Sequence, residues 1–232
     1  MSTWQDIWQR KALNHEEADY SLAQLMKLDG YDISCSAVSV DGFRDFAAQL
    51  KEKLAVTEGQ SVLEIGCGAG ALLKAFDDLG LTVAGLDYTD ELVQICRAAI
   101  PGGVFETGEA KELDFEKKDF DAVVSHSVFH YFPSTDYALE SFSKMIDHTR
   151  EGGIVALTDM HLASMKEAHE KHRMEMIGEA KFKELYSELS HSYFDPADFV
   201  AVAKEKCAEV SVEDQFIKTE SAAYKFNLFA RK

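Results

Sequence analysis

The stretch Ser61-Val-Leu-Glu-Ile-Gly-Cys-Gly-Ala-Gly70 decides the fold of this 232-residue chain. Its first five residues predict a short buried strand, three alternating glycines break that strand, and Ala71–Phe76 starts a helix. Glycine lets the backbone turn sharply or approach a ligand closely. A strand, a tight turn and a helix N-terminus leave backbone N–H groups and a positive helix end beside the turn. The stretch therefore predicts a binding site for a nucleotide-type cofactor.

Strands and helices alternate after this stretch. Thr89 would cap the first of the following helices, and Gly152 and Gly153 would separate the next helix from a strand. We expect strands at 82–86, 104–106, 120–125 and 154–158, and helices at 90–99 and 137–149. Such alternation is typical of a parallel, doubly wound sheet. Asp195-Pro196 starts a further helix, and the last strands, 209–216 and 224–230, favour an antiparallel hairpin at the sheet edge.

Two regions lie outside the alternation. Residues 1–57 predict a helical cap with helices around Trp4, Ile7 and Trp8, at 16–28 and after Asp41, which would cap the third, and with a loop at 29–39. We expect this cap to cover the cofactor end of the main domain at 58–232, although Trp4 and Trp8 could instead pack as core. Residues 161–194 are charged, break near Gly178 and predict a helical lid inserted in the main domain.

Composition limits the class of protein. The chain is 46% hydrophobic and 28% charged, as expected for one globular domain. No apolar run approaches the roughly 20 residues of a membrane span, and the N-terminus lacks the pattern of a signal peptide. Cys35, Cys67, Cys96 and Cys207 form no C-x-x-C pair, so we expect a reducing cytoplasm and neither a disulfide framework nor a zinc site.

The formal net charge is −17. Proteins that bind nucleic acid use clustered lysine and arginine to displace counterions. The acidic balance therefore argues against a nucleic-acid partner.

Two acids flank the glycines. Glu64 lies within the first strand, and Asp87 ends the next strand, where a carboxylate can accept hydrogen bonds from ribose hydroxyls. The run from Gly66 to Ala71 also satisfies the G-x-G-x-x-A pattern of dinucleotide sites. These residues leave the identity of the cofactor open.

A resemblance to a known protein family narrows the choice of cofactor. Glu64-Ile-Gly-Cys-Gly-Ala-Gly70 resembles motif I of class I S-adenosylmethionine-dependent methyltransferases, and Gly85-Leu-Asp-Tyr-Thr89 resembles their next motif. Thr107-Gly-Glu-Ala110 stands where relatives have a G-D-A turn, with Glu109 in place of Asp. The run Phe120–Phe132 resembles the strand-four motif of the small-molecule branch, a methyltransferase-11 or -25 type domain, and Tyr224–Lys232 resembles the antiparallel last strand.

The resemblance implies a Rossmann-like three-layer sandwich with a seven-stranded, mostly parallel sheet whose last strand is antiparallel. It implies S-adenosylmethionine as cofactor, S-adenosylhomocysteine as product and a methyl acceptor. On this basis we expect the cofactor to contact Trp8, Glu64, Gly66, Cys67, Gly68, Gly70, Asp87, Tyr88, Thr89, Gly108, Glu109, Ala110, Ser125, His126 and Ser127.

A catalytic base is needed only if the acceptor holds a proton at neutral pH. His126 and His130, just past the fourth strand, are the candidates, and His161 is a third. The alternative for His130 is a packed, hydrogen-bonded turn histidine. For His169, His172 and His191 we expect a solvated or lid role rather than metal ligation.

Absent motifs limit the acceptor. The N/D-P-P-Y/F run of amino methyltransferases and the Pro-Cys pair of cytosine-C5 enzymes are missing after the fourth strand, where Ser125-His-Ser-Val128 stands. With the acidic charge, this favours transfer of a methyl group to a small molecule. Two alternatives stay open: an NAD-dependent dehydrogenase, and a non-catalytic protein that keeps the fold and binds the cofactor.

Overall fold

The computed structural model describes residues 3–13, 20–31, 37–186, 189–217 and 219–232. Within these residues, seven strands form one sheet in the order β3-β2-β1-β4-β5-β7-β6. The strands are β1 (Ser61–Ile65), β2 (Thr82–Asp87), β3 (Val104–Thr107), β4 (Phe120–His126), β5 (Thr149–His161), β6 (Glu209–Asp214) and β7 (Lys225–Arg231). Neighbours from β3 to β5 are parallel, whereas β7 is antiparallel to both β5 and β6. The expected sheet is confirmed, with β6 at its edge.

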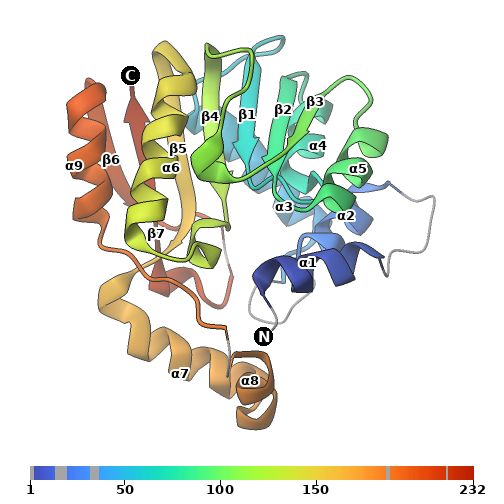
Figure 1. The fold of residues 1–232 in the computed structure, drawn as a ribbon, viewed down its shortest axis with the longest axis vertical. Coiled ribbons are helices and arrows are strands. Elements are labelled where there is room, and N and C mark those ends of the chain that lie inside the picture. Colours follow the sequence, from blue (N-terminus) through green and yellow to red (C-terminus); the bar gives the residue numbers. More distant parts are fainter. Residues whose placement is uncertain (1–2, 14–19, 32–36, 187–188, 218) are drawn as a thin grey trace.

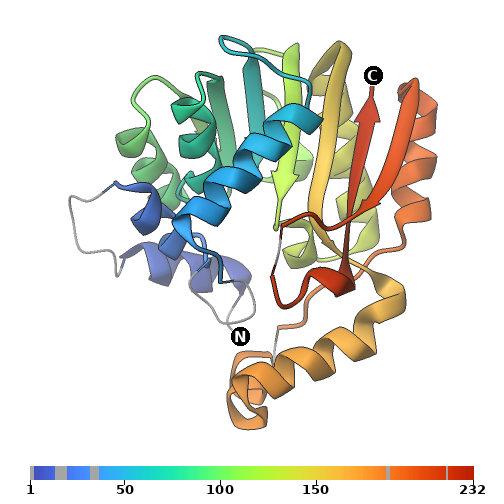
Figure 2. The same ribbon diagram turned by 180° about the vertical axis from the view of Figure 1, so that it is seen from behind.

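Helices cover both faces of the sheet (Figures 1 and 2). Successive strand residues point to opposite faces, so Val62 and Leu63 belong to two different apolar clusters. One cluster contains residues of α2 (Leu22–Leu28), α3 (Val40–Lys53), α4 (Ala71–Asp78) and α5 (Asp90–Ala99). The other contains residues of α6 (Thr135–His148) and α9 (Pro196–Lys206). The three-layer sandwich explains why every residue of β1 is buried.

Capping residues shift several helix boundaries. Ser39, not Asp41, caps α3, because its hydroxyl accepts a hydrogen bond of 3.1 Å from the Gly42 N–H. Ser134 does the same for α6, which therefore begins two residues before the expected position. Thr89 precedes α5, but its hydroxyl makes no capping bond. Asp195 caps α9 as expected, with 2.9 Å between its carboxylate and the Ala197 N–H.

Strand β5 is much longer than the expected 154–158. Gly152 and Gly153 lie inside it, because Thr149 pairs with Phe120 and, after a register shift, Ile154 pairs with Ala122. A Cβ on Gly153 would stand 2.7 Å from the Asp121 carbonyl oxygen, so a side chain there would clash with the neighbouring backbone. The glycine pair marks an irregularity within the strand rather than its beginning.

Additional helices lie beyond the carboxyl ends of the parallel strands (Figure 1). They are α1 (Trp4–Leu13), α7 (Lys166–Ile177) and α8 (Glu179–Tyr186), the last two separated at Gly178. Of the helix expected at 16–28, the described residues 20–28 are helical at Leu22–Leu28. Residues 16–19 lie outside the described part of the chain, as do 32–36 of the expected loop. A search of the described helices found none with the length and apolar character that crossing a bilayer requires.

Candidate active site

A cavity of about 660 Å³ opens at the carboxyl ends of the parallel strands. It lies beside β1, from which the chain order runs outward to β2 on one side and β4 on the other. In open α/β sheets this reversal of strand order leaves a crevice where ligands bind. The cavity thus coincides with the glycine stretch from which the sequence analysis began.

The glycine loop is held by the end of β2. The N–H groups of Gly66 and Cys67 donate to the Leu86 carbonyl at 2.7 and 3.0 Å. Gly66 and Gly68 have φ values of +77° and +53°, which L side chains rarely adopt. A Cβ on Gly66 would stand 2.5 Å from Val128. Protein side chains, as well as a ligand, therefore require glycine in this loop.

Asp87 connects the loop to the next helix. Its buried carboxylate accepts hydrogen bonds from the Gly68 N–H at 2.9 Å and from the Thr89 N–H at 2.8 Å. Burial raises the pKa of Asp87, while these two hydrogen bonds act in the opposite direction. An ionised carboxylate can accept about four hydrogen bonds. Asp87 can therefore still accept bonds from a diol in the cavity.

Glu64 presents an unsatisfied acceptor. It is 3% exposed and lines the cavity, and its Oε2 atom has no hydrogen-bond partner among the described residues. Burial raises the pKa of Glu64 well above its usual range, and the nearby Asp29 and Asp87 add to the effect. A buried polar atom without a partner calls for an explanation. A cation bound beside Glu64 would satisfy this oxygen.

Asp29 is one of the cavity-lining residues that sequence reasoning missed. Its carboxylate accepts hydrogen bonds from the Ala69 N–H at 2.7 Å and the Ala71 N–H at 2.9 Å, at the start of α4. A Cβ on Gly68 would lie 2.3 Å from this carboxylate. Burial raises the pKa of Asp29 to about 7. Its position just before Gly30, at the end of an apolar helix, could have marked Asp29 as a candidate site residue. Nothing in the sequence indicated that its partners are the N–H groups of Ala69 and Ala71.

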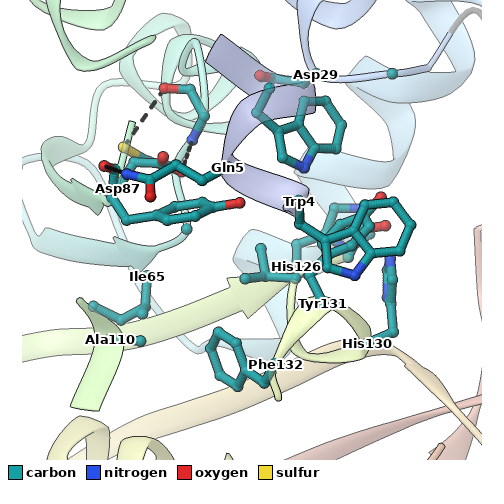
Figure 3. Close-up of a pocket in the computed structure, with 18 of the residues that line it drawn as sticks. Trp4, Gln5, Asp29, Ile65, Asp87, Ala110, His126, His130, Tyr131 and Phe132 are labelled. Atoms are coloured by element: carbon teal, nitrogen blue, oxygen red, sulfur yellow. Dashed lines mark hydrogen bonds between the residues drawn. The ribbon is translucent and has the colours of Figure 1, made fainter. Parts of the chain in front are cut away.

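Helix α1 forms one wall of the cavity. Gln5 donates to the Tyr88 carbonyl at 3.0 Å, and Trp4 packs edge-on against Tyr131 with 4.9 Å between ring centroids. Trp8 lines the cavity, as expected for a cofactor contact, and packs against the same tyrosine at 5.6 Å. Figure 3 shows Trp4, Gln5 and Tyr131 at the cavity wall.

Another part of the cavity wall is apolar. Ile65, Ala110 and Phe132 lie together in the cavity, away from His130 (Figure 3). Next to Ala110, Glu109 stands at the expected turn, but its carboxylate accepts a 2.6 Å hydrogen bond from the Tyr137 hydroxyl. Glu109 is thus held in place by Tyr137 of α6.

The cavity brings together most residues expected at the cofactor. Those that line it are Trp8, Glu64, Gly66, Cys67, Gly68, Asp87, Tyr88, Gly108, Glu109, Ala110, His126 and Ser127. Three others do not line it. Ser125 donates its hydroxyl to the Ile65 carbonyl, a Cβ on Gly70 would contact Cys96, and Thr89 contributes its N–H to Asp87. These three residues contact residues around the cavity rather than the cavity itself.

His126 is packed among aromatic rings. Its ring centroid lies 4.6 Å from that of Phe46 and 6.0 Å from that of Tyr31, which is parallel to it. Its Nδ1 atom pairs with the Thr158 hydroxyl at 2.9 Å, whereas Nε2 has no partner among the described residues. Burial lowers the pKa of His126 to about 4, so the ring is neutral at neutral pH.

His130 stacks on His161 with 4.2 Å between ring centroids, and both line the cavity. His169 meets His161 edge-on at 4.7 Å and is 1% exposed, so of the expected solvated or lid role the solvated one is wrong. Burial lowers the pKa of each of these three histidines. Among the described residues, no group of histidine, cysteine and acidic side chains is arranged to hold a metal ion.

The known proteins that resemble this chain are methyltransferases. Residues 63–157 match the family model described as a methyltransferase domain. An uncharacterized methyltransferase of Synechocystis sp. is 30% identical over 56% of this chain and 60% of that protein. A fatty-acid O-methyltransferase of Mycolicibacterium smegmatis is 34% identical over 52% of this chain and 43% of that protein. The matches thus span less than two thirds of either relative.

Solved structures share the fold. The amino pentose methyltransferase CalS10 of Micromonospora echinaspora, solved with S-adenosylmethionine bound, has a TM-score of 0.66 at 14% identity, over 94% of this chain and all of that one (100%). The family model, the relatives and the sheet with its reversed β7 agree, and none of the proteins named here is a dehydrogenase. Residues 63–157 thus match a methyltransferase domain, and the chain shares the fold of an S-adenosylmethionine-dependent methyltransferase.

Proposed function

We propose that this chain binds S-adenosylmethionine and transfers its methyl group to a small-molecule acceptor. The observation that carries the proposal is the placement of Glu64 and Asp87. Both carboxylates are buried on either side of the glycine loop, and Glu64 keeps an oxygen without a partner among the described residues. The match of residues 63–157 to a methyltransferase domain supports the same activity.

The cavity residues fit the cofactor part by part. Glu64 would accept hydrogen bonds from the α-ammonium group, and Asp87 would accept them from the ribose hydroxyls. Ile65, Ala110 and Phe132 offer an apolar wall for adenine. The cofactor supplies an electrophilic methyl group on its sulfonium, so the protein need not generate a reactive centre of its own.

The protein's part in the transfer is to align the acceptor and exclude water. Alignment alone can remove roughly 7–11 kcal/mol of a barrier at best. We propose that residues 1–57 and 161–194 act as cap and lid, because α1 and α7 both contribute cavity-lining side chains. Such covers can also limit turnover through opening and closing.

If the acceptor carries a proton, His126 and His130 are the proposed proton acceptors. Both line the cavity and both are neutral at neutral pH, because burial lowers their pKa values. Each has a buried ring nitrogen without a partner among the described residues, Nε2 in His126 and Nδ1 in His130. A neutral imidazole with a free nitrogen can accept a proton from a hydroxyl or ammonium group.

The net charge of −17 argues for a small-molecule acceptor rather than nucleic acid. We further propose the reducing cytoplasm as the place of action. The cysteines are far apart in the sequence, and Cys67, Cys96 and Cys207 are free thiols.

Calorimetric titration with S-adenosylmethionine, S-adenosylhomocysteine and NAD tests the proposal. We expect saturable binding of both sulfur compounds and none of NAD. Glu64→Gln should weaken both, whereas Glu116→Gln, an equal charge change at an exposed position outside the cavity, should not. Saturable binding of NAD without binding of either sulfur compound would overturn the assignment.

A further inference from the structure

The two ends of the cavity differ in charge. The lining acids Asp29, Glu64 and Asp87, together with Glu109 and Glu112 beside Lys111, surround the glycine loop and the turn after β3. At the other end the ionisable lining residues are His130, His161, His169, His191, Arg173 and Lys225. Among the described residues, no carboxylate side chain lines this second end.

The second end is built by elements far apart in the chain. His161 ends β5, His169 and Arg173 come from α7, and His191 follows α8. Their rings form a compact group, with His161 5.2 Å from His191 and 4.7 Å from His169 between centroids. We call this group, with His130, the histidine cluster.

The cluster has unsatisfied buried atoms. His130, His161 and His169 are 4%, 3% and 1% exposed, and the Nδ1 atom of each has no hydrogen-bond partner among the described residues. Three such atoms on residues that line one cavity point to a ligand with several polar groups. Because the imidazoles are neutral, each can donate one hydrogen bond and accept another.

Two cationic side chains, Lys225 and Arg173, line this end of the cavity. Lys225 is neutralised by Asp159, whose carboxylate oxygens lie 2.8 and 2.9 Å from the lysine Nζ. Arg173 is 5% exposed, lines the cavity and packs its guanidinium over Phe182 at 5.8 Å. A guanidinium has five N–H donors in one plane and matches carboxylates and phosphates, so it can hold an anion while keeping other contacts.

We propose that Arg173 and the histidine cluster form an acceptor subsite that binds the anionic group, a carboxylate or a phosphate monoester, of the molecule to be methylated. This rests on the proposed function, because it assigns the opposite end of the same cavity to the cofactor. The cationic cofactor meets acids at one end, and the anionic acceptor meets donors at the other. The cavity thereby orients the two molecules by charge as well as by shape.

Small aromatic probes that differ in charge test the proposal. The full chain, labelled with ¹⁵N-histidine and saturated with S-adenosylhomocysteine, is titrated with benzoate, phenyl phosphate, benzamide or benzylamine. Imidazole signals of the cluster, assigned with His161→Gln and His169→Gln, report binding. We expect benzoate or phenyl phosphate to shift them saturably, and neither benzamide nor benzylamine to do so at the same concentrations.

Two variants of α7 distinguish binding at the subsite from a general effect of positive charge on the protein. Arg173→Gln should weaken binding of the anionic probe at least about tenfold, as expected for a lost charge-assisted contact. Lys171→Gln removes the same charge from an exposed side chain of the same helix and should leave binding unchanged. Both variants should keep their affinity for S-adenosylhomocysteine, which shows that they are folded.

The outcomes distinguish the two proposals. If S-adenosylhomocysteine fails to bind the wild-type chain, the proposed function fails. If it binds but the neutral or cationic probe shifts the cluster as strongly as the anions, the subsite proposal is wrong. Saturable shifts with zinc ions and none with either anion would equally overturn it. A response to only one of the two anions supports it and identifies the group recognised.

Discussion

The Ser127 hydroxyl donates a 2.8 Å hydrogen bond to the carboxylate of Asp159, and both residues have left-handed backbone conformations, with φ of +60° and +65°. Non-glycine residues adopt this region at a cost of order 1–3 kcal/mol and often do so at functional sites. Ser127 follows β4 and lines the cavity, and Asp159 lies at a register shift of β5. The same carboxylate holds Lys225 of β7. Strain and a buried ion pair thus meet at the rim of the cavity.

Asp159→Asn should destabilise the fold by about 3–5 kcal/mol, because it leaves the buried ammonium of Lys225 without its counter-charge. Denaturant unfolding followed by far-UV circular dichroism measures the loss. Asp147→Asn is the matched control, since its ion pair with Lys206 lies on the surface, and it should change stability by less than about 1 kcal/mol. Equal losses in both variants would contradict a special role for the buried pair.

The buried histidines should each contribute a loss of stability at pH values well above the usual range of carboxylate titration, whereas the raised pKa values of Asp29 and Glu64 act in the opposite direction. Burial lowers the pKa of His126 to about 4 and that of His169 to about 3, from an unfolded value near 6.5. A lowered histidine pKa means that the unfolded chain binds the proton first, so stability is lost as pH falls from about 6.5 toward 4. His126 alone accounts for about 3 kcal/mol. Unfolding free energies of the wild-type chain and of His126→Gln, measured from pH 7.5 to 4.5, check this, and the same pH profile in both proteins would contradict it.

Asp87→Asn should weaken S-adenosylhomocysteine binding by at least ~1.5–3 kcal/mol, the typical contribution of hydrogen bonds to a charged group. The amide also supplies fewer acceptor positions for the Gly68 and Thr89 N–H groups that Asp87 now holds. Calorimetry measures the affinity. Asp78→Asn, an equal charge change on the exposed face of α4, serves as control. Unchanged affinity in Asp87→Asn would mean that the ribose lies elsewhere.

Affinity for S-adenosylmethionine should rise between pH 6 and pH 8. Burial raises the pKa of Asp29 to about 7, so part of the protein carries a neutral Asp29 at pH 6. A cationic ligand nearby favours the ionised form and must displace that proton. In Asp29→Asn this pH dependence should be reduced, because no proton is released there. Calorimetry in buffers of different ionisation enthalpy counts the protons, and the same count in both proteins would exclude Asp29 as their source.

Much of the scaffold follows from local sequence. The apolar run 61–65, the glycines after it and the capping pair Asp195-Pro196 specify a strand, a turn and a helix start through backbone preferences that neighbouring residues alone decide. The order of such elements implies a parallel sheet, and the final strand, β7, occupies the reversed position that the family resemblance implies. Glu64 and Asp87 could be predicted as site residues because they lie within or directly beside these elements.

Tertiary structure alone decided the contacts between distant segments. Asp29 meets Ala69 and Ala71 across some 40 positions (sequence separations of 40 and 42), and no periodicity links an acid in a loop to the start of another helix. The histidine cluster gathers side chains from β5, α7 and the segment before α9, each unremarkable in its own neighbourhood. Local patterns set backbone conformation and burial, whereas the partner of a buried charge depends on how the elements pack. The sequence by itself therefore determined where a cofactor site forms, and the packed structure decided which charges surround it.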